Sequence, residues 1–70
     1  MMPLLYATAG EENIIRKVDG SQEIKKHMED LGFVAGGKVT VISEMNGNLI
    51  VNVKDSRIAV SREMAGKIMI

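Results

Sequence analysis

Three side chains that can ligate metal lie close together in the sequence. Glu23, His27 and Asp30 are spaced i, i+4 and i+7, which places them along one side of a helix if this stretch is helical. An imidazole with neighbouring carboxylates can coordinate a borderline divalent transition metal. A single helix supplies only an open site, so we interpret the three first as a solvated face with local contacts such as Lys26–Asp30. A metal site is the second interpretation.

Other catalytic chemistry finds little support in the residue types. The chain has no cysteine and only one histidine, and its four serines fall at expected caps, turns or strand ends. His27 lies in the middle of an expected helix, so no serine–histidine triad is indicated. Glu11 and Glu12 are adjacent, and in an extended segment their side chains point to opposite faces. We therefore expect a protein that binds rather than an enzyme.

Length and composition further restrict the kind of protein that this chain can be. Seventy residues suit one domain, residues 1–70, with a thin core. Nine basic residues balance nine acidic ones, and Tyr6 and Phe33 are the only aromatic residues. Nucleic-acid binders usually carry a basic surplus and stacking aromatics, so we expect no nucleic-acid partner. The apolar start, residues 1–6, is too short for an anchor and has no basic leader, and the lack of cysteine fits a cytoplasmic location.

The first half of the chain predicts a strand followed by a helix. Residues 13–18 are rich in β-branched side chains between polar residues, which favours a strand. Ser21 is typical of a helix cap, and an apolar stripe at i, i+4 and i+7 predicts a helix over residues 22–31. Gly32 then supplies a left-handed stop. This short amphipathic helix must dock on a sheet.

The second half predicts a hairpin and further short strands. Residues 38–44 and 48–54 alternate as strands on either side of Asn46-Gly47, a strong hairpin signal. Val39, Val41 and Ser43 are expected on one face, opposite a matching row at 49, 51 and 53. Residues 57–60 form another strand, Ser61 caps a helical turn over 62–66, and residues 67–70 form a last edge strand. We predict a mostly β fold, a small SH3-like barrel of about five strands. Edges at 67–70 or 2–6 could pair between copies in a weak homodimer.

The order of these features resembles the FeoA family across essentially the whole chain. The resemblance rests on Leu4-Leu5, Gly10, Gly20, Leu31-Gly32-Phe33, Gly37-x-Val39, the Asn46-Gly47 hairpin, Leu49-Ile50-Val51, Arg57-Ile58-Ala59-Val60-Ser61 and Met64-Ala65-x-x-Ile68-x-Ile70. The chain departs from the family pattern at Ala35, where a proline is usual, in the doubled Gly36-Gly37, and in Asn-Gly where the hairpin often has Gly-Pro. It also lacks the Glu-x-x-Gln pair that can bind metal in repressor-type members.

The resemblance implies an SH3-like fold and a function. Free-standing members of this family are small cytosolic proteins of bacterial ferrous-iron uptake, thought to act on the large GTPase-linked membrane permease. The same domain also forms the C-terminal part of iron- and manganese-dependent repressors. We therefore predict a non-catalytic accessory protein that docks on the ferrous iron permease at the cytoplasmic membrane face. The alternative is an SH3-like nucleic-acid-binding or metal-responsive regulator domain.

Partner contacts are expected on loops carried by the rigid barrel. Phe33, Val34 and Met45 are the residues that we predict to touch the partner. No cofactor is implied with certainty, and a divalent transition metal held near His27 stays open as a prediction.

Overall fold

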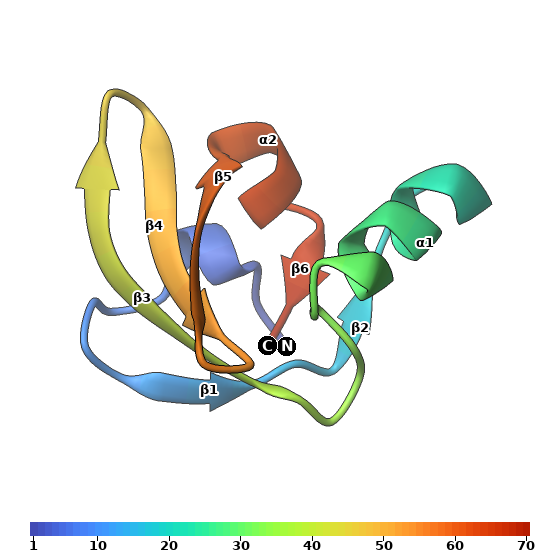
Figure 1. Ribbon diagram of the computed structural model, residues 1–70, viewed down its shortest axis with the longest axis horizontal. Coiled ribbons are helices and arrows are strands. Elements are labelled where there is room, and N and C mark those ends of the chain that lie inside the picture. Colours follow the sequence, from blue (N-terminus) through green and yellow to red (C-terminus); the bar gives the residue numbers. More distant parts are fainter.

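The computed structural model describes the whole chain, residues 1–70. Strands make up most of the fold, and the helices are short (Figure 1). The elements follow one another as 3-10 helix η1 (Leu4–Tyr6), β1 (Glu12–Ile14), β2 (Lys17–Val18), α1 (Gln22–Asp30), β3 (Lys38–Met45), β4 (Asn48–Val53), β5 (Ser56–Ser61), α2 (Arg62–Ala65) and β6 (Ile68–Met69).

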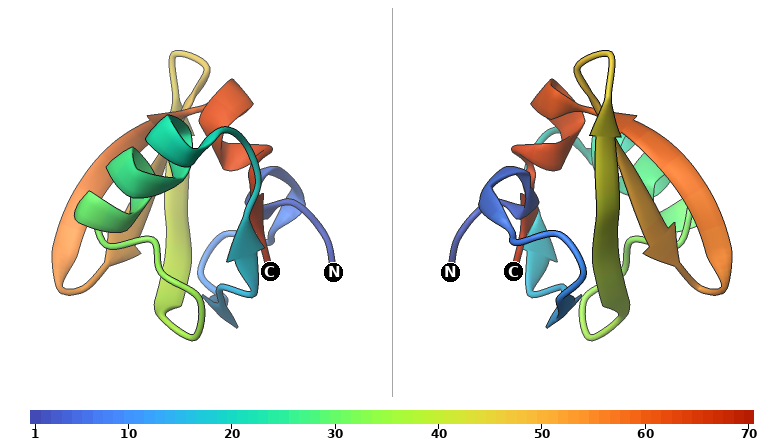
Figure 2. Two further views of the ribbon diagram at one scale, coloured as in Figure 1. Left: turned by 90° about the vertical axis from the view of Figure 1, so that its right-hand side faces the viewer. Right: turned by 90° about the vertical axis from the view of Figure 1, so that its left-hand side faces the viewer.

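The strands form two antiparallel sheets that curl around a common core. The larger sheet has the order β1-β3-β4-β5, and the smaller one pairs β2 with β6. Figure 2 shows the two sheets facing each other, with α1 and α2 placed across the space between them. The predicted small β fold is confirmed, with six strands and an open rather than a closed barrel.

The core consists of apolar side chains from both sheets, both helices and the N-terminal segment. Val39 and Val41 on β3 stand opposite Val53 and Val51 on β4, so one face of this hairpin is buried. Burying each such side chain contributes about 1.5–3 kcal/mol before entropy is counted. The buried set is Leu4, Ile15, Met28, Phe33, Val39, Val41, Leu49, Val51, Val53, Val60, Ala65 and Ile68.

The single strand predicted over residues 13–18 is two strands in different sheets. At Ile15 the chain leaves β3: the Ile15 N–H donates to the Gly37 carbonyl, and the Arg16 N–H donates to the Met69 carbonyl. Ile15 itself is buried at this crossing. The segment therefore links the two sheets, which a run of β-branched residues alone does not indicate.

A β-bulge changes the face assignment in β3. The register shifts between Val41 and Ser43, so Ile42 is the additional residue opposite β4. Ser43 is exposed, and its predicted place in the buried row with Val39 and Val41 was wrong. A bulge inserts one residue into the alternation and moves the following side chains to the other face.

The two ends of the chain pair with each other. Met2 and Ile70 exchange two backbone hydrogen bonds of 3.0 and 2.8 Å, and Pro3 forms a bridge with Met69. The edges that we expected to pair between copies are therefore joined within one chain, next to the 3-10 helix η1 that the sequence pattern did not predict. Figure 1 shows both termini side by side near β6.

The predicted caps and the predicted hairpin turn are confirmed. The Ser21 Oγ accepts the Ile24 N–H at 3.2 Å, and the Ser61 Oγ accepts the Met64 N–H at 3.1 Å. Asn46 and Gly47 both have positive φ, 52° and 82°, as a two-residue turn that matches strand twist requires. These local signals fix where α1, α2 and the β3–β4 hairpin begin and end.

Candidate functional site

The predicted partner contacts occupy very different environments. Phe33 is only 1% exposed and belongs to the core cluster, so it is a core residue and not a surface contact. It lies three residues after Asp30, the last residue of α1, and its N–H donates to the Met28 carbonyl at 2.9 Å. The backbone therefore folds Phe33 under the helix instead of presenting it on the loop.

The other two predicted contacts lie at opposite ends of β3. Val34 is half-buried in the loop before this strand, whereas Met45 at its end is 59% exposed. A strand advances about 3.3 Å per residue, so the eight residues of β3 separate these two regions by more than about 20 Å. In Figure 1 the loop lies below the sheet and the β3–β4 turn projects from its top. Val34 and Met45 therefore do not form one patch.

The candidate metal ligands remain on the exposed side of α1. Glu23, His27 and Asp30 are all exposed, and the Asp30 Oδ1 lies 3.9 Å from the Lys26 Nζ. A helix rises 1.5 Å per residue, which puts the first and last of the three about 10 Å apart along the axis. The structure contains no group of three or more His, Cys, Asp and Glu side chains arranged to hold a metal ion. The three residues are not brought together as a metal centre.

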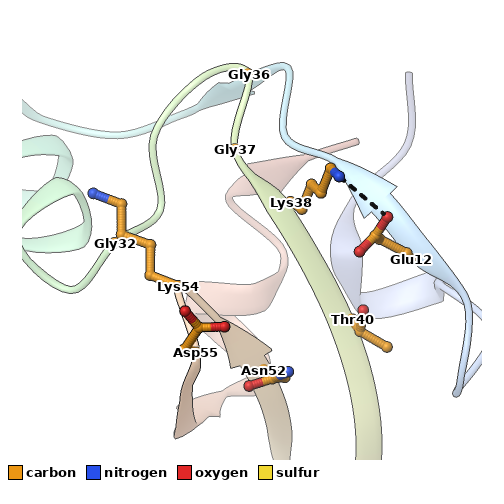
Figure 3. Close-up of a pocket in the computed structure, with 9 residues that line it drawn as sticks. All are labelled: Glu12, Gly32, Gly36, Gly37, Lys38, Thr40, Asn52, Lys54 and Asp55. Carbon is orange, nitrogen blue, oxygen red and sulfur yellow. Dashed lines mark ion pairs between the residues drawn. The ribbon is translucent and has the colours of Figure 1, made fainter.

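A polar hollow lies between the α1–β3 loop and the outer face of the larger sheet. Its volume is about 390 Å³, and no hydrophobic side chain lines it. Figure 3 shows the two glycines of the loop above it, a lysine at either side and two uncharged polar side chains on the strands below. The lining residues are Glu12, Gly32, Gly36, Gly37, Lys38, Thr40, Asn52, Lys54 and Asp55.

The sheet register explains how these side chains come together. Glu12 pairs with Thr40, and Thr40 pairs with Asn52, so the three form a cross-strand row on the face opposite the buried valines. The Lys38 Nζ lies 4.0 Å from the Glu12 Oε1, as marked in Figure 3. Both side chains are more than half exposed, so this ion pair adds little stability.

The far side of the hollow is formed by an unusual turn. Lys54 and Asp55, which join β4 to β5, have φ of 48° and 63°, a region that L-residues other than Asn, Asp and Gly seldom occupy. A Cβ on Gly32 would lie 3.4 Å from the Lys54 Cδ, so the lysine stem packs on this glycine. The Gly36 N–H is already bonded to the Ile15 carbonyl and the Gly37 N–H to the Val34 carbonyl, so these amides do not form an anion cradle.

The hollow was missed by reasoning from the sequence, although a signal for it exists. The outward positions of β3 and β4 are polar at Thr40 and Asn52, and Gly36-Gly37 removes side chains from the loop above them. Its four charged side chains balance, two of each sign. The hollow can thus bind polar groups through hydrogen bonds and charge pairs.

The basic side chains are distributed over most elements of the fold. Four of the nine basic side chains form ion pairs: Lys17 with Asp19 at 3.4 Å, Lys26 with Asp30, Lys38 with Glu12, and Arg62 with Glu44 at 3.1 Å. The other five lie between β1 and β2, on α1, in the β4–β5 turn, on β5 and between α2 and β6: Arg16, Lys25, Lys54, Arg57 and Lys67. No helix is long and apolar enough to cross a membrane.

Comparison with protein families places the chain. The family model described as the FeoA domain matches residues 2–70. The chain belongs to the FeoA family. This match covers η1, both sheets and both helices, so the family resemblance predicted from the order of glycines and apolar runs is confirmed.

Individual FeoA relatives agree in sequence and in fold. A Methanocaldococcus jannaschii protein, provisionally named Fe(2+) transport protein A, is 39% identical over all of this chain and 85% of its own length. A crystal structure of an iron uptake regulatory protein, FeoA, superposes with a TM-score of 0.87 at 24% identity, over 96% of this chain and 89% of that one.

A zinc complex of FeoA from Stenotrophomonas maltophilia has a TM-score of 0.85 at 21% identity, over 99% of this chain and 88% of that one. That protein is described as a prokaryotic SH3 domain protein, and a role as a ferrous iron transport activating factor is suggested for it. A manganese-dependent transcriptional repressor is similar in fold, with a TM-score of 0.82 at 13% identity over 38% of that chain.

Proposed function

We propose that this chain is a cytoplasmic, non-catalytic accessory protein of ferrous iron uptake that docks on the GTPase-linked iron permease. The observation that carries the proposal is the FeoA match over residues 2–70, together with a relative that is named for Fe(2+) transport and is 39% identical over all of this chain. A binding role also suits the surface. Its one hollow is lined by lysines, carboxylates, glycines and amide or hydroxyl groups, and none of its titratable side chains is buried.

The β3–β4 hairpin end, Met45–Asn48, is the part of the molecule best suited to contact the permease. Met45 is exposed, and the unbranched thioether side chain of methionine adapts to irregular apolar surfaces. The turn beneath it is held by its own positive-φ residues and by the Glu44–Arg62 ion pair to α2. A rigidly mounted loop of this kind is a common carrier of recognition.

The function is tested by binding and by transport together. Cells that express the permease with a tagged copy of this chain are expected to yield the permease in pull-downs from solubilised membranes. Deletion of the chain is expected to lower uptake of ⁵⁵Fe(II). The proposal fails if the permease is not recovered and uptake is unchanged by the deletion.

A substitution at the hairpin end tests the docking surface. Met45→Asp is expected to weaken permease binding by about tenfold, because a charge at the centre of an apolar contact must be desolvated. Tyr6→Asp is the matched control, since Tyr6 is 69% exposed on η1 and lies on a different element. Biolayer interferometry with the purified permease measures both. Equal losses for the two variants would show that the hairpin end has no special role.

A further inference from the structure

The edge strands of the two sheets differ in length and in how far other parts of the chain cover them. In the larger sheet β1 and β5 are the outer strands, but β1 has three residues whereas β5 has six. In the smaller sheet the strands have two residues each, and the chain start at Met2 and Pro3 covers β6. In both views of Figure 2 β5 forms the outline of the molecule, with no strand beyond it. β5 is therefore the one long open edge.

Backbone groups of β5 point to this open side in alternation. Val53 and Ser56 close the two-residue turn, and the pair that closes such a turn exchanges hydrogen bonds. Ser56, Ile58 and Val60 thus bond to β4, while the N–H and C=O groups of Arg57 and Ala59 face outward. Outside the sheet ladder, no hydrogen bond or ion pair involves these two residues.

The open edge also lacks most of the devices that normally prevent strand pairing. Natural edge strands are shortened, bulged, or carry proline or charged side chains, lysine above all. The Ser-Arg-Ile-Ala-Val-Ser sequence of β5 has no lysine and no proline, and its register with β4 is continuous from Ser56 to Ser61. Its single charge, Arg57, lies near one end.

We propose that β5 is a self-association edge, on which a second copy of this chain adds its own β5 antiparallel about a twofold axis at Ala59. The strand is complementary to itself in this register. Ala59 meets the Ala59 of the other copy, Arg57 lies opposite Ser61, and the inward Ile58 lies opposite Val60. No like charges face each other, and the half-buried Ile58 gains an apolar neighbour. The four-stranded sheet would then continue from one copy into the next.

The register is tested by the association of purified protein in solution. Sedimentation equilibrium is expected to show an apparent mass that rises with concentration from 7.6 kDa toward twice that value. Ala59→Lys sets two lysines against each other at the axis and is expected to weaken association by about tenfold or more. Ser43→Lys, which also introduces a lysine at an exposed site but on the inner strand β3, is expected to leave association unchanged.

Amide hydrogen exchange measures the same interface residue by residue. The amides of Arg57 and Ala59 are expected to become protected as the protein concentration rises, whereas those of Ile58 and Val60 are protected at all concentrations. A chain that stays at 7.6 kDa up to millimolar concentration would overturn the proposal. So would self-association that Ala59→Lys leaves intact. Neither measurement involves the permease, so the outcome is independent of the proposed function.

Discussion

Two adjacent non-glycine residues with positive φ form the β4–β5 turn, Lys54 at 48° and Asp55 at 63°. A left-handed backbone costs an L-residue about 1–2 kcal/mol, somewhat less for Asp. The other hairpin of the same chain uses Asn46-Gly47 for the same turn geometry. We therefore expect Asp55→Gly to raise the free energy of unfolding by about 0.5–1 kcal/mol, after the greater unfolded-state entropy of glycine is included. Urea denaturation measures the change.

The reverse substitution in the other turn is the matched control. Nothing lies within 4 Å of a Cβ placed on Gly47, whose φ is +82°, so Gly47→Ala changes backbone strain without a steric clash. We expect it to lower the free energy of unfolding by about 1 kcal/mol. If Asp55→Gly also destabilised the protein, the Asp55 carboxylate would be making a stabilising contact at the hollow that outweighs its strain.

At the scale of elements, two serines begin the two helices through the same contact. The Ser21 Oγ accepts the Ile24 N–H of α1, and the Ser61 Oγ accepts the Met64 N–H of α2. Ser21→Ala and Ser61→Ala are each expected to lower the free energy of unfolding by about 1 kcal/mol, because an N–H of the first turn loses its acceptor. Thermal unfolding followed by circular dichroism measures this. Ser43→Ala, at an exposed non-capping site, should change stability by less than about 0.5 kcal/mol.

These caps and the Asn46-Gly47 turn could be predicted because each depends on residues within four positions of one another. The division of residues 13–18 into β1 and β2 could not, since it depends on pairing of Ile15 with Gly37 and of Arg16 with Met69. The bulge at Ile42 likewise arises from the partner strand. Local chemistry thus set the element boundaries, and distant pairing decided how the elements are divided between sheets.

The candidate site could not be predicted from local sequence for the same reason. Phe33 follows a helix stop in a glycine-rich stretch, a pattern equally compatible with an exposed loop and with the buried position that it occupies. The hollow depends on the row that joins Glu12, Thr40 and Asn52 across three strands. Its residues come together only when the register is known, and no sequence spacing relates them.

At the scale of the whole molecule, the first and last segments of the chain complete the fold together. Leu4 is 0% exposed, and η1 contacts both α2 and β6, while Met2 pairs with Ile70. A domain of this size is stabilised by about 4–10 kcal/mol, and a buried Leu→Ala change costs about 2–5 kcal/mol. Leu4→Ala should therefore remove a large part of the stability and lower the urea midpoint accordingly.

The neighbouring Leu5 is the control that separates the effect of burying Leu4 from a general effect of the N-terminal segment. Leu5 is only half-buried against the core, so Leu5→Ala should cost about 1 kcal/mol, well below the loss at Leu4. Both changes are the same Leu→Ala replacement within η1, so the two variants differ mainly in how much buried surface they lose. Similar small losses at the two positions would mean that the segment merely lies on the surface. A large loss at Leu4 alone would mean that the burial of Leu4 between α2 and β6 holds the start of the chain against the sheet of β2 and β6.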